Sequence, residues 1–345
     1  MIPRPTPERF RLRRTMMFMN AQKPGLIKDA YIYGVDSIML DLEDAVAENQ
    51  KDAARFSLYH ALKTIDYGDT EVIVRINGLD TPHWQEDIRV CVAGGADGIR
   101  IAKCESAQDV KIVEEHVEKA EREFGVEVGR TLLMAALESP KGIMNAYEIC
   151  AASDRMFGVA ISGGDFRKCM QTKPTADGID MLFARGQMLL AARAAGVQCF
   201  DTVFTDLDDM EGFINEVRQN KAMGFDGKSL INPKQIRPVH EIFAPTEKEV
   251  AQAEAWVSAF REAQARGVGV FTVNGKMVDA AFIPGAERTL CWPRPAACMR
   301  GIWYEKRCWT GYSRIPVCGR PRGLSGKKLY GRPVYAEGRA AYPPL

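Results

Sequence analysis

The sequence predicts a (β/α)₈ barrel. Eight short strand-like runs alternate with stretches long and amphipathic enough to form crossover helices, and this alternation is typical of a parallel sheet. The eight units occupy about 230 residues, close to the ~250 residues of a usual (β/α)₈ barrel. A doubly wound open sheet is the alternative, but no G-x-G-x-x-G motif follows the first strand-like run.

The predicted strands are short apolar runs, and the fifth is the clearest. Thr131–Leu137 is apolar on both faces, as expected of a strand in a parallel sheet covered by helices. It is also too short to span a membrane. The eight runs are Thr15–Met19, Ser37–Leu40, Val72–Ile76, Gly98–Ala102, Thr131–Leu137, Met156–Ile161, Cys199–Phe204 and Lys228–Ile231.

Helical periodicity is clearest in two segments. Between the fourth and fifth strands, Val110–Phe124 places apolar residues at i, i+3 and i+7, which form one face of a helix. After the eighth strand, Thr246 and Glu249 form a capping box that opens a long helix, and Gly267 marks its expected end. Residues 268–279 then indicate an extended segment. The apolar stripe of the long helix is Val250, Ala253, Val257 and Phe260.

Composition excludes several classes of protein. The 345 residues are 46% hydrophobic and 26% charged, which fits a globular protein, and the net charge of +1 argues against nucleic-acid binding by the whole chain. No apolar stretch approaches membrane-spanning length, and the N-terminus has no hydrophobic signal core, so we expect a cytoplasmic protein with no membrane partner. The nine Cys and four His show no C-x-x-C or H-E-x-x-H spacing, which argues against a disulfide framework or a zinc site.

Charge is unevenly distributed along the chain. Residues 284–345 carry twelve Lys/Arg and three Asp/Glu, whereas residues 1–283 carry 34 and 42. One interpretation of the C-terminal stretch is a basic arm that binds RNA or an acidic partner. The other is a poorly ordered or out-of-frame tail that did not evolve to fold, which its unpatterned Trp and Cys favour. We therefore predict a barrel at 13–240, a C-terminal helix and arm at 241–283, and an atypical basic tail at 284–345.

Polar side chains gather where the predicted strands end, and in a barrel these ends converge on one mouth. Glu138 follows the fifth strand, and Asp165 follows the sixth after two glycines that allow a close backbone approach. Acids brought together without cations repel one another, and a divalent cation removes that cost. With no His or Cys nearby, these oxygen ligands favour Mg²⁺. The alternative for Glu138 is that it caps the following helix.

Other charged residues at the strand ends leave alternatives open. Arg75 either binds a substrate carboxylate or a developing negative charge, or it pairs with the acidic cluster. Lys103 either forms a Schiff base with a carbonyl substrate or pairs with Glu43 or Glu105. Asp44 is also explained by helix capping.

A set of short motifs is spread over residues 13–279. They are Arg13-Arg14-Thr-Met-Met-Phe, Asp41-Leu-Glu-Asp44-Ala-Val, Val74-Arg75-Ile-Asn77, Gly94-Gly-Ala-Asp97, Glu138-Ser-Pro-Lys-Gly142-Ile, Phe200-Asp-Thr-Val, Gly224-Phe-Asp-Gly-Lys-Ser-Leu-Ile-Asn-Pro233 and Asn274-Gly-Lys-Met-Val-Asp279. Jointly they resemble the HpcH/HpaI aldolase superfamily and, within it, the citrate lyase beta subunits, which are close to malyl- and citramalyl-CoA lyases.

The resemblance implies a magnesium-dependent carbon–carbon lyase with a (β/α)₈ barrel that assembles into homo-oligomers. Members of this family cleave a citryl thioester into oxaloacetate and an acetyl thioester, within a complex that includes an acyl-carrier subunit and an acyl-transferase subunit. A stand-alone malyl- or citramalyl-CoA lyase is the alternative within enzymes. A non-catalytic barrel that scaffolds other chains is the alternative outside them.

The resemblance also implies roles for individual residues. Arg75 resembles the substrate-binding arginine, and we predict that Asn77 and Glu138 contribute to substrate binding as well. Glu138 and Asp165 resemble the magnesium ligands, and the substrate's hydroxyl and carboxylate would bind the same ion. Asp279 matches an acid that the family offers to a neighbouring subunit's site.

The sequence matches the family pattern at two further acids and differs from it in three places. Glu43 and Asp44 match acids that hold metal-bound waters. The sequence after the first strand lacks the family's Pro-Gly-Asn-like turn, and Gly164 stands where an acid often precedes the ligand Asp. The family's C-terminal helical end is replaced by the basic tail.

Overall fold

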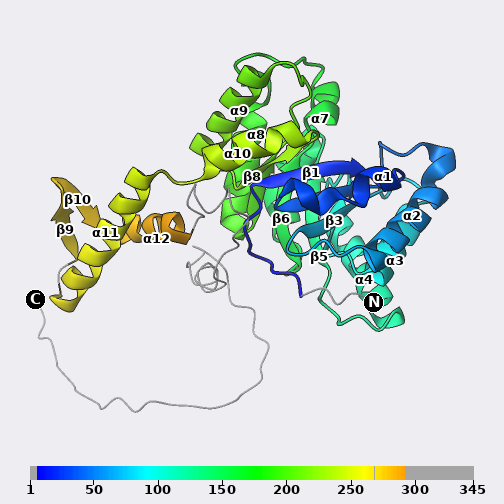
Figure 1. The fold of residues 1–345 in the computed structure, drawn as a ribbon, viewed down its shortest axis with the longest axis horizontal. Helices are drawn as coiled ribbons and strands as arrows, with labels where there is room; N and C mark the ends of the chain where they lie inside the picture. The colour runs from blue at the N-terminus through cyan, green and yellow to red at the C-terminus, as the bar shows by residue number, and fades with distance from the viewer. Residues whose placement is uncertain (1–5, 268, 292–345) are drawn as a thin grey trace, which may run out of the picture.

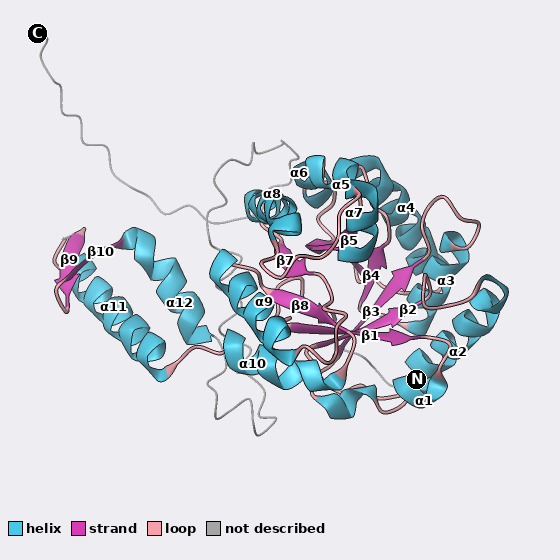
Figure 2. Cartoon of the chain, turned by 90° about the horizontal axis from the view of Figure 1, so that it is seen from above, coloured by secondary structure: helices cyan, strands magenta, loops and turns pink. Residues whose placement is uncertain are grey.

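The predicted barrel is confirmed in the computed structural model, which describes residues 6–267 and 269–291. Eight parallel strands pair in chain order, and β1 also pairs with β8, through Thr15 and Lys228, which closes the barrel (Figure 2). Every predicted strand matches an observed one to within three residues at either end. The strands are β1 (Thr15–Asn20), β2 (Ser37–Asp41), β3 (Glu71–Ile76), β4 (Gly98–Ile101), β5 (Leu132–Leu137), β6 (Met156–Ile161), β7 (Gln198–Asp201) and β8 (Gly227–Leu230).

Helices cover the outside of the barrel (Figure 1). The segment predicted at 110–124 matches a helix that begins with a capping box at Ser106 and Asp109 and ends at Glu123. None of the helices in the described ranges has the length and apolar character needed to cross a bilayer. The helices of the barrel are α1 (Pro24–Ile27), α2 (Lys51–Thr64), α3 (Trp84–Gly94), α4 (Ala107–Glu123), α5 (Pro140–Met144), α6 (Ala146–Cys150), α7 (Gly163–Met170), α8 (Ile179–Ala195), α9 (Met210–Met223) and α10 (Ile236–Phe243), with 3₁₀ turns at Ala30–Tyr33, Glu48–Gln50 and Pro233–Gln235.

Two apolar layers explain why the strands are apolar on both faces. The larger layer lies between the strands and the surrounding helices. The smaller one fills the barrel interior with side chains such as Met16, Met39, Met134, Phe157 and Phe200, all fully buried. The interior is therefore a packed core, and only the carboxyl ends of the strands leave room for a site.

Ion pairs close the opposite, amino-terminal face of the barrel. Arg13, two residues before β1, donates to both carboxylate oxygens of Glu71 at 2.7 Å, and its guanidinium lies 4.1 Å from the centre of the Phe157 ring. Arg14 pairs with Asp36 at 2.8 Å. Burial alone would raise the pKa of Asp36, but the Arg14 guanidinium outweighs it and lowers the pKa to about 2. These contacts join β1 to its neighbours far from the mouth, so their role is stability.

An arm follows the barrel and extends to one side of it (Figure 1; Figure 2). It begins with α11 (Glu247–Ala265), whose predicted capping box at Thr246 and Glu249 and buried apolar stripe are both confirmed. The segment predicted as extended forms an antiparallel hairpin of β9 (Val270–Val273) and β10 (Lys276–Asp279). A 3₁₀ turn (Ala280–Phe282) leads to α12 (Ile283–Cys291).

Helix α12 changes the interpretation of the tail. The predicted boundary at 284 falls inside this helix, because Ile283, Ala286 and Leu290 lie on one face and pack against the apolar cluster of α11. Arg288 of α12 also reaches back to Asp226, just before β8, at 2.9 Å. The rest of the predicted tail, 292–345, lies outside the described residues.

Candidate active site

The carboxyl ends of the strands surround a cavity of about 420 Å³. Three predicted site residues, Asp44, Arg75 and Asp165, line it. Glu43 and Glu138 are buried side chains in contact with residues that line it, namely Arg75 and Ser162. The predicted convergence of strand-end polar groups at one mouth is therefore what the structure shows.

Arg75 is held by three carboxylates. Its Nε and Nη2 donate to the two oxygens of Asp41, and its Nη1 lies 2.9 Å from Glu43 and 3.7 Å from Asp44. Burial would lower the pKa of Arg75, but these acids raise it overall, so the side chain is a permanent cation. The observed geometry is compatible with both interpretations of Arg75, because the side chain pairs with the acidic cluster and also lines the cavity.

Glu43 is an acid of unusual pKa. Burial raises the pKa of Glu43 to about 7, while Arg75 opposes the shift and Glu138 adds to it. Lys103 Nζ lies 3.0 Å from Glu43, so the predicted pairing of Lys103 with Glu43 is what the structure shows. Lys103 also has a left-handed backbone with φ of +49°, a conformation that non-glycine residues seldom adopt and that concentrates at functional sites.

Glu138 is a buried carboxylate whose hydrogen-bonding capacity is only partly used by the described residues. Ser162 Oγ donates to its Oε1 at 3.1 Å, whereas its Oε2 has no hydrogen-bond partner among the described residues. Burial raises the pKa of Glu138, and the guanidiniums of Arg100 and Arg75 partly offset this. The helix cap after β5 is made by Ser139, whose Oγ accepts from the Gly142 amide at 3.2 Å, so capping does not explain Glu138.

Asp165 lies in the first turn of α7, four residues beyond the end of β6. The start of α7 is fixed by Gly163, whose amide donates to Thr202 Oγ1 at 2.8 Å. A Cβ at Gly163 would lie 2.9 Å from that oxygen, whereas one at Gly164 would meet nothing within 4 Å. The close approach predicted for the glycine pair therefore belongs to Gly163 alone.

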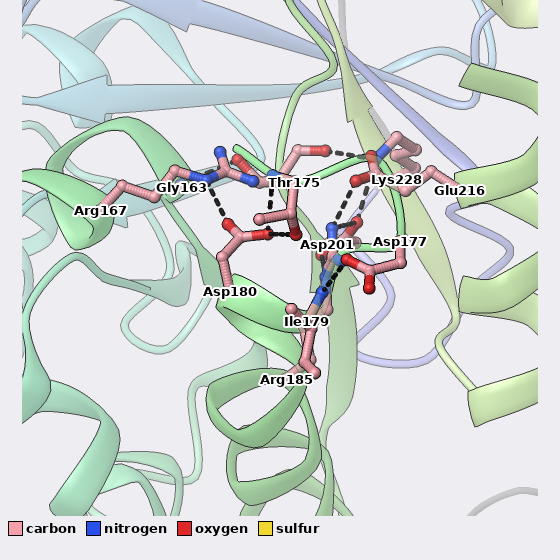
Figure 3. A network of polar contacts seen from close by, with 11 residues as sticks. Gly163, Arg167, Thr175, Asp177, Ile179, Asp180, Arg185, Asp201, Glu216 and Lys228 are labelled. Atoms are coloured by element: carbon pink, nitrogen blue, oxygen red, sulfur yellow. Dashed lines mark hydrogen bonds and ion pairs between the residues drawn. The ribbon is translucent and has the colours of Figure 1, made fainter. Parts of the chain in front are cut away.

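Next to this contact lies a buried network of ion pairs among Arg185, Asp201, Glu216 and Lys228 (Figure 3). Lys228 Nζ of β8 donates to the Thr202 carbonyl at 2.8 Å, to Asp201 at 3.0 Å and to Glu216 at 2.5 Å. Arg185 of α8 donates to both oxygens of Asp201 and to Glu216. Burial would raise the pKa of Asp201, but the two cations lower it well below its usual range.

These acids fit magnesium. The described residues contain no group of three or more His, Cys, Asp or Glu arranged to hold a metal ion. Mg²⁺ does not require one, since it commonly binds one or two carboxylates together with waters and substrate oxygens. Glu138 and Asp165 are close enough to repel each other electrostatically, and no residue in the described ranges forms a hydrogen bond with Glu138 Oε2. We therefore assign Glu138 and Asp165 as the candidate ligands.

Two further predicted site residues do not line the cavity. Asn77 donates through its amide nitrogen to Asp87 of α3 at 2.6 Å, and it does not line the cavity. Asp279 ends β10 at the far end of the arm, where its Oδ1 accepts from the Ala281 amide at 2.8 Å (Figure 2). Within one chain, Asp279 is therefore remote from Arg75 and Glu138.

Sequence reasoning missed Arg100. This residue lies inside the short strand β4, it is 1% exposed, and it lines the cavity. The signal was present, since a cation in the middle of a four-residue strand that is buried throughout needs a reason.

Comparison with known proteins points in one direction. The HpcH/HpaI aldolase/citrate lyase family matches residues 14–233. The citrate lyase subunit beta of Leuconostoc mesenteroides subsp. cremoris is 51% identical over 280 residues, covering 81% of this chain and 93% of that protein. A (3S)-malyl-CoA thioesterase of Cereibacter sphaeroides is 35% identical over 287 residues, covering 83% and 96%. The crystal structure of CitE from Mycobacterium tuberculosis with magnesium, acetoacetate and coenzyme A has a TM-score of 0.65 and 31% identity, covering 80% and 96%.

Proposed function

The chain belongs to the HpcH/HpaI aldolase/citrate lyase family, and we propose that it is the lyase subunit that cleaves a citryl thioester into oxaloacetate and an acetyl thioester. The observation that carries this proposal is Glu138. It is a buried carboxylate with one oxygen unpartnered among the described residues, next to a cavity that Asp165 and Arg75 line. Such a site suits a metal-bound, carboxylate-bearing substrate.

The metal is Mg²⁺, held by Glu138 and Asp165. When bound, the ion would supply Lewis-acid polarisation of substrate oxygens. The Mycobacterium tuberculosis relative was crystallised with magnesium, which supports the same ion here. Thr202 supports this site, because its Oγ1 accepts from the Gly163 amide. This contact fixes the first turn of α7 and with it the backbone of Asp165.

The protein's own groups then act on charge and protons. Arg75 presents a fixed positive charge to the oxygen on which negative charge develops, a contribution worth about 3–4 kcal/mol for one well-placed donor. Glu43, whose pKa is raised by burial, is the group that we propose exchanges a proton with the substrate hydroxyl or with a water. Asp44 lies at the same mouth, where we place it beside metal-bound water.

We also propose that the chain works in a homo-oligomer inside a larger complex with acyl-carrier and acyl-transferase subunits. The support for self-association is an exposed apolar stripe on α8, at Ile179, Phe183 and Leu190. Five cysteines are free thiols, and four of them are buried, which supports a reducing, cytoplasmic location. They are Cys91, Cys104, Cys150, Cys169 and Cys199.

Cleavage of defined thioesters by the full chain tests the function. We expect turnover of a citryl thioester with added Mg²⁺ and loss of turnover in EDTA. Equal or faster turnover of malyl- or citramalyl-CoA would instead support the second candidate, which the malyl-CoA thioesterase relative favours. No metal-dependent cleavage of any of the three would favour a scaffold role.

A further inference from the structure

We propose that Arg100 anchors an anionic subsite for the second carboxylate of the oxo-acid half of the substrate. This inference rests on the proposed function and deepens it, since it names the feature that separates a citryl thioester from malyl and citramalyl thioesters. Cleavage of a citryl thioester releases a dicarboxylate, oxaloacetate. Cleavage of the other two releases monocarboxylates, glyoxylate and pyruvate.

The first argument is the environment of Arg100. Its Nη2 donates to Ser162 Oγ at 3.0 Å, and its guanidinium carbon lies 5.2 Å from the centre of the Phe18 ring. Its Nε and Nη1 are buried and have no hydrogen-bond partner among the described residues. A buried guanidinium with two unmet donors is costly to keep, and an arriving carboxylate removes that cost.

The second argument is a comparison with the other cations near the barrel mouth. Arg75 already forms a two-point contact with Asp41 and pairs with Glu43. Lys103 pairs with Glu43 as well. Arg100 forms no ion pair of this kind with any residue at 6–267 or 269–291, and its attraction to Glu138 acts at longer range. Among the arginines that line this cavity, Arg100 is therefore the one whose charge is not already paired with a carboxylate of the described part of the chain.

The third argument is the chemistry of the guanidinium. Burial and the nearby Arg75 lower the pKa of Arg100 to about 10, which leaves it charged at neutral pH. Its planar fork matches the two oxygens of a carboxylate, a geometry that an ammonium group does not reproduce. Arg100 also lines the same cavity as Arg75 and Asp165, so one substrate can reach the metal ligands and Arg100 together.

A different role would be that of a counter-charge to Glu138, which would affect all substrates alike. The two roles are separated by measuring the binding of oxaloacetate and of pyruvate to the full-length protein in the presence of Mg²⁺, by titration calorimetry. We expect the unmodified protein to bind oxaloacetate more tightly. In Arg100→Met, a change to an apolar side chain of similar length, oxaloacetate affinity should fall about 10- to 100-fold, the range for a charged hydrogen bond. Pyruvate and Mg²⁺ affinities should change less than about twofold.

Two further variants sharpen the test. Arg100→Lys keeps the charge but loses the fork, so it should lose part of the discrimination, and it gives the same comparison if Arg100→Met does not fold. Arg237→Gln removes an exposed cation of α10 that pairs with Glu241 on the outside of the barrel, and both affinities should be unchanged. Equal losses for oxaloacetate and pyruvate, weakened Mg²⁺ binding in Arg100→Met, or no preference in the unmodified protein would each overturn the subsite.

Failure of the proposed function gives a different pattern. If the chain binds the dicarboxylate through Arg100 but cleaves no citryl thioester, the subsite stands and the lyase assignment falls. If it cleaves the thioester and Arg100→Met retains full discrimination, the reverse holds.

Discussion

Arg75 and Asp41 form a two-point contact on neighbouring strands: Nε donates to Oδ1 at 2.7 Å and Nη2 to Oδ2 at 2.6 Å. Asp41 is itself fixed, because it accepts from the backbone amides of Glu43 at 3.0 Å and Ala45 at 3.2 Å. The orientation of the Arg75 guanidinium is therefore set before substrate arrives, which is what electrostatic stabilisation of a transition state requires.

Replacement of Arg75 by Lys tests this orientation. Lys keeps the charge but loses the planar fork, so we expect kcat/KM for the citryl thioester to fall about 100-fold or more. The lost contact with Asp41 should also cost about 1–3 kcal/mol of unfolding free energy, measured by chemical denaturation. Preserved turnover in the folded fraction would show that Arg75 only braces the acids.

Replacement of Glu138 by Gln tests the metal ligand. Gln has the same shape but no charge, so we expect Mg²⁺ affinity to fall about 100-fold or more, since even residues that only support a ligand cost 10- to 100-fold. Glu105→Gln is the matched control, because Glu105 follows β4 and pairs with Ser139 and Lys141 instead. Full activity in EDTA would rule out this metal site.

Replacement of Thr202 by Val tests how α7 is positioned. Val has nearly the same volume but no acceptor for the Gly163 amide, which is left unpaired at a cost of about 1–3 kcal/mol. We expect Mg²⁺ affinity to fall about tenfold through the displaced Asp165. Thr64→Val, at the exposed end of α2, is the control and should leave the affinity unchanged. An unchanged affinity in Thr202→Val would mean that α7 is held by other contacts.

Mixing of two inactive variants tests whether Asp279 serves a neighbouring site. Arg75→Ala and Asp279→Ala subunits are each expected to be inactive. In a 1:1 mixture, a site with Arg75 from one chain and Asp279 from another forms in roughly a quarter of cases if subunits combine at random. We therefore expect roughly a quarter of the unmodified activity. No recovery under conditions of proven subunit exchange would contradict a shared site.

Acid titration tests the amino-terminal face. The pKa of Asp36 in the folded protein is about 2, below its ordinary value of 3.8, so its contribution to stability is complete above pH ~4 and is lost as pH falls toward 2. The difference in unfolding free energy between the unmodified protein and Asp36→Asn should shrink by about 2 kcal/mol over that range. Asp29→Asn, which removes an exposed acid, should show no such change.

The barrel was predictable because each of its strands is encoded by a short apolar run, and this pattern repeats along the chain. Each parallel strand is buried on both faces, so a run such as Leu132–Leu137 is apolar throughout and stands out in the sequence. The same pattern allowed acidic site residues to be predicted, because a residue directly after such an apolar run lies at the barrel mouth. Glu138 was found in this way.

The residues that were missed or misplaced depend on tertiary contacts. Arg100 lies within a strand, and its unmet donors become visible only when its neighbours from β1 and β6 are known. Asn77 shares a motif with Arg75, yet its side chain is taken up by Asp87 on α3. The end of the helical pattern was placed too early, because α12 is stabilised mainly by its packing against α11.

During synthesis, β1 leaves the ribosome well before the strand that completes its pairing. Thr15 pairs with Lys228, 213 residues later, and at about 5–20 residues per second that partner follows roughly 10–40 s afterwards. Over this interval the nascent sheet has an open edge at β1, and the interior side chains such as Met16 remain uncovered. The yield of active enzyme should therefore depend on chaperones that bind the growing chain. A synonymous change that slows translation before β8 should lower that yield without altering a single site residue.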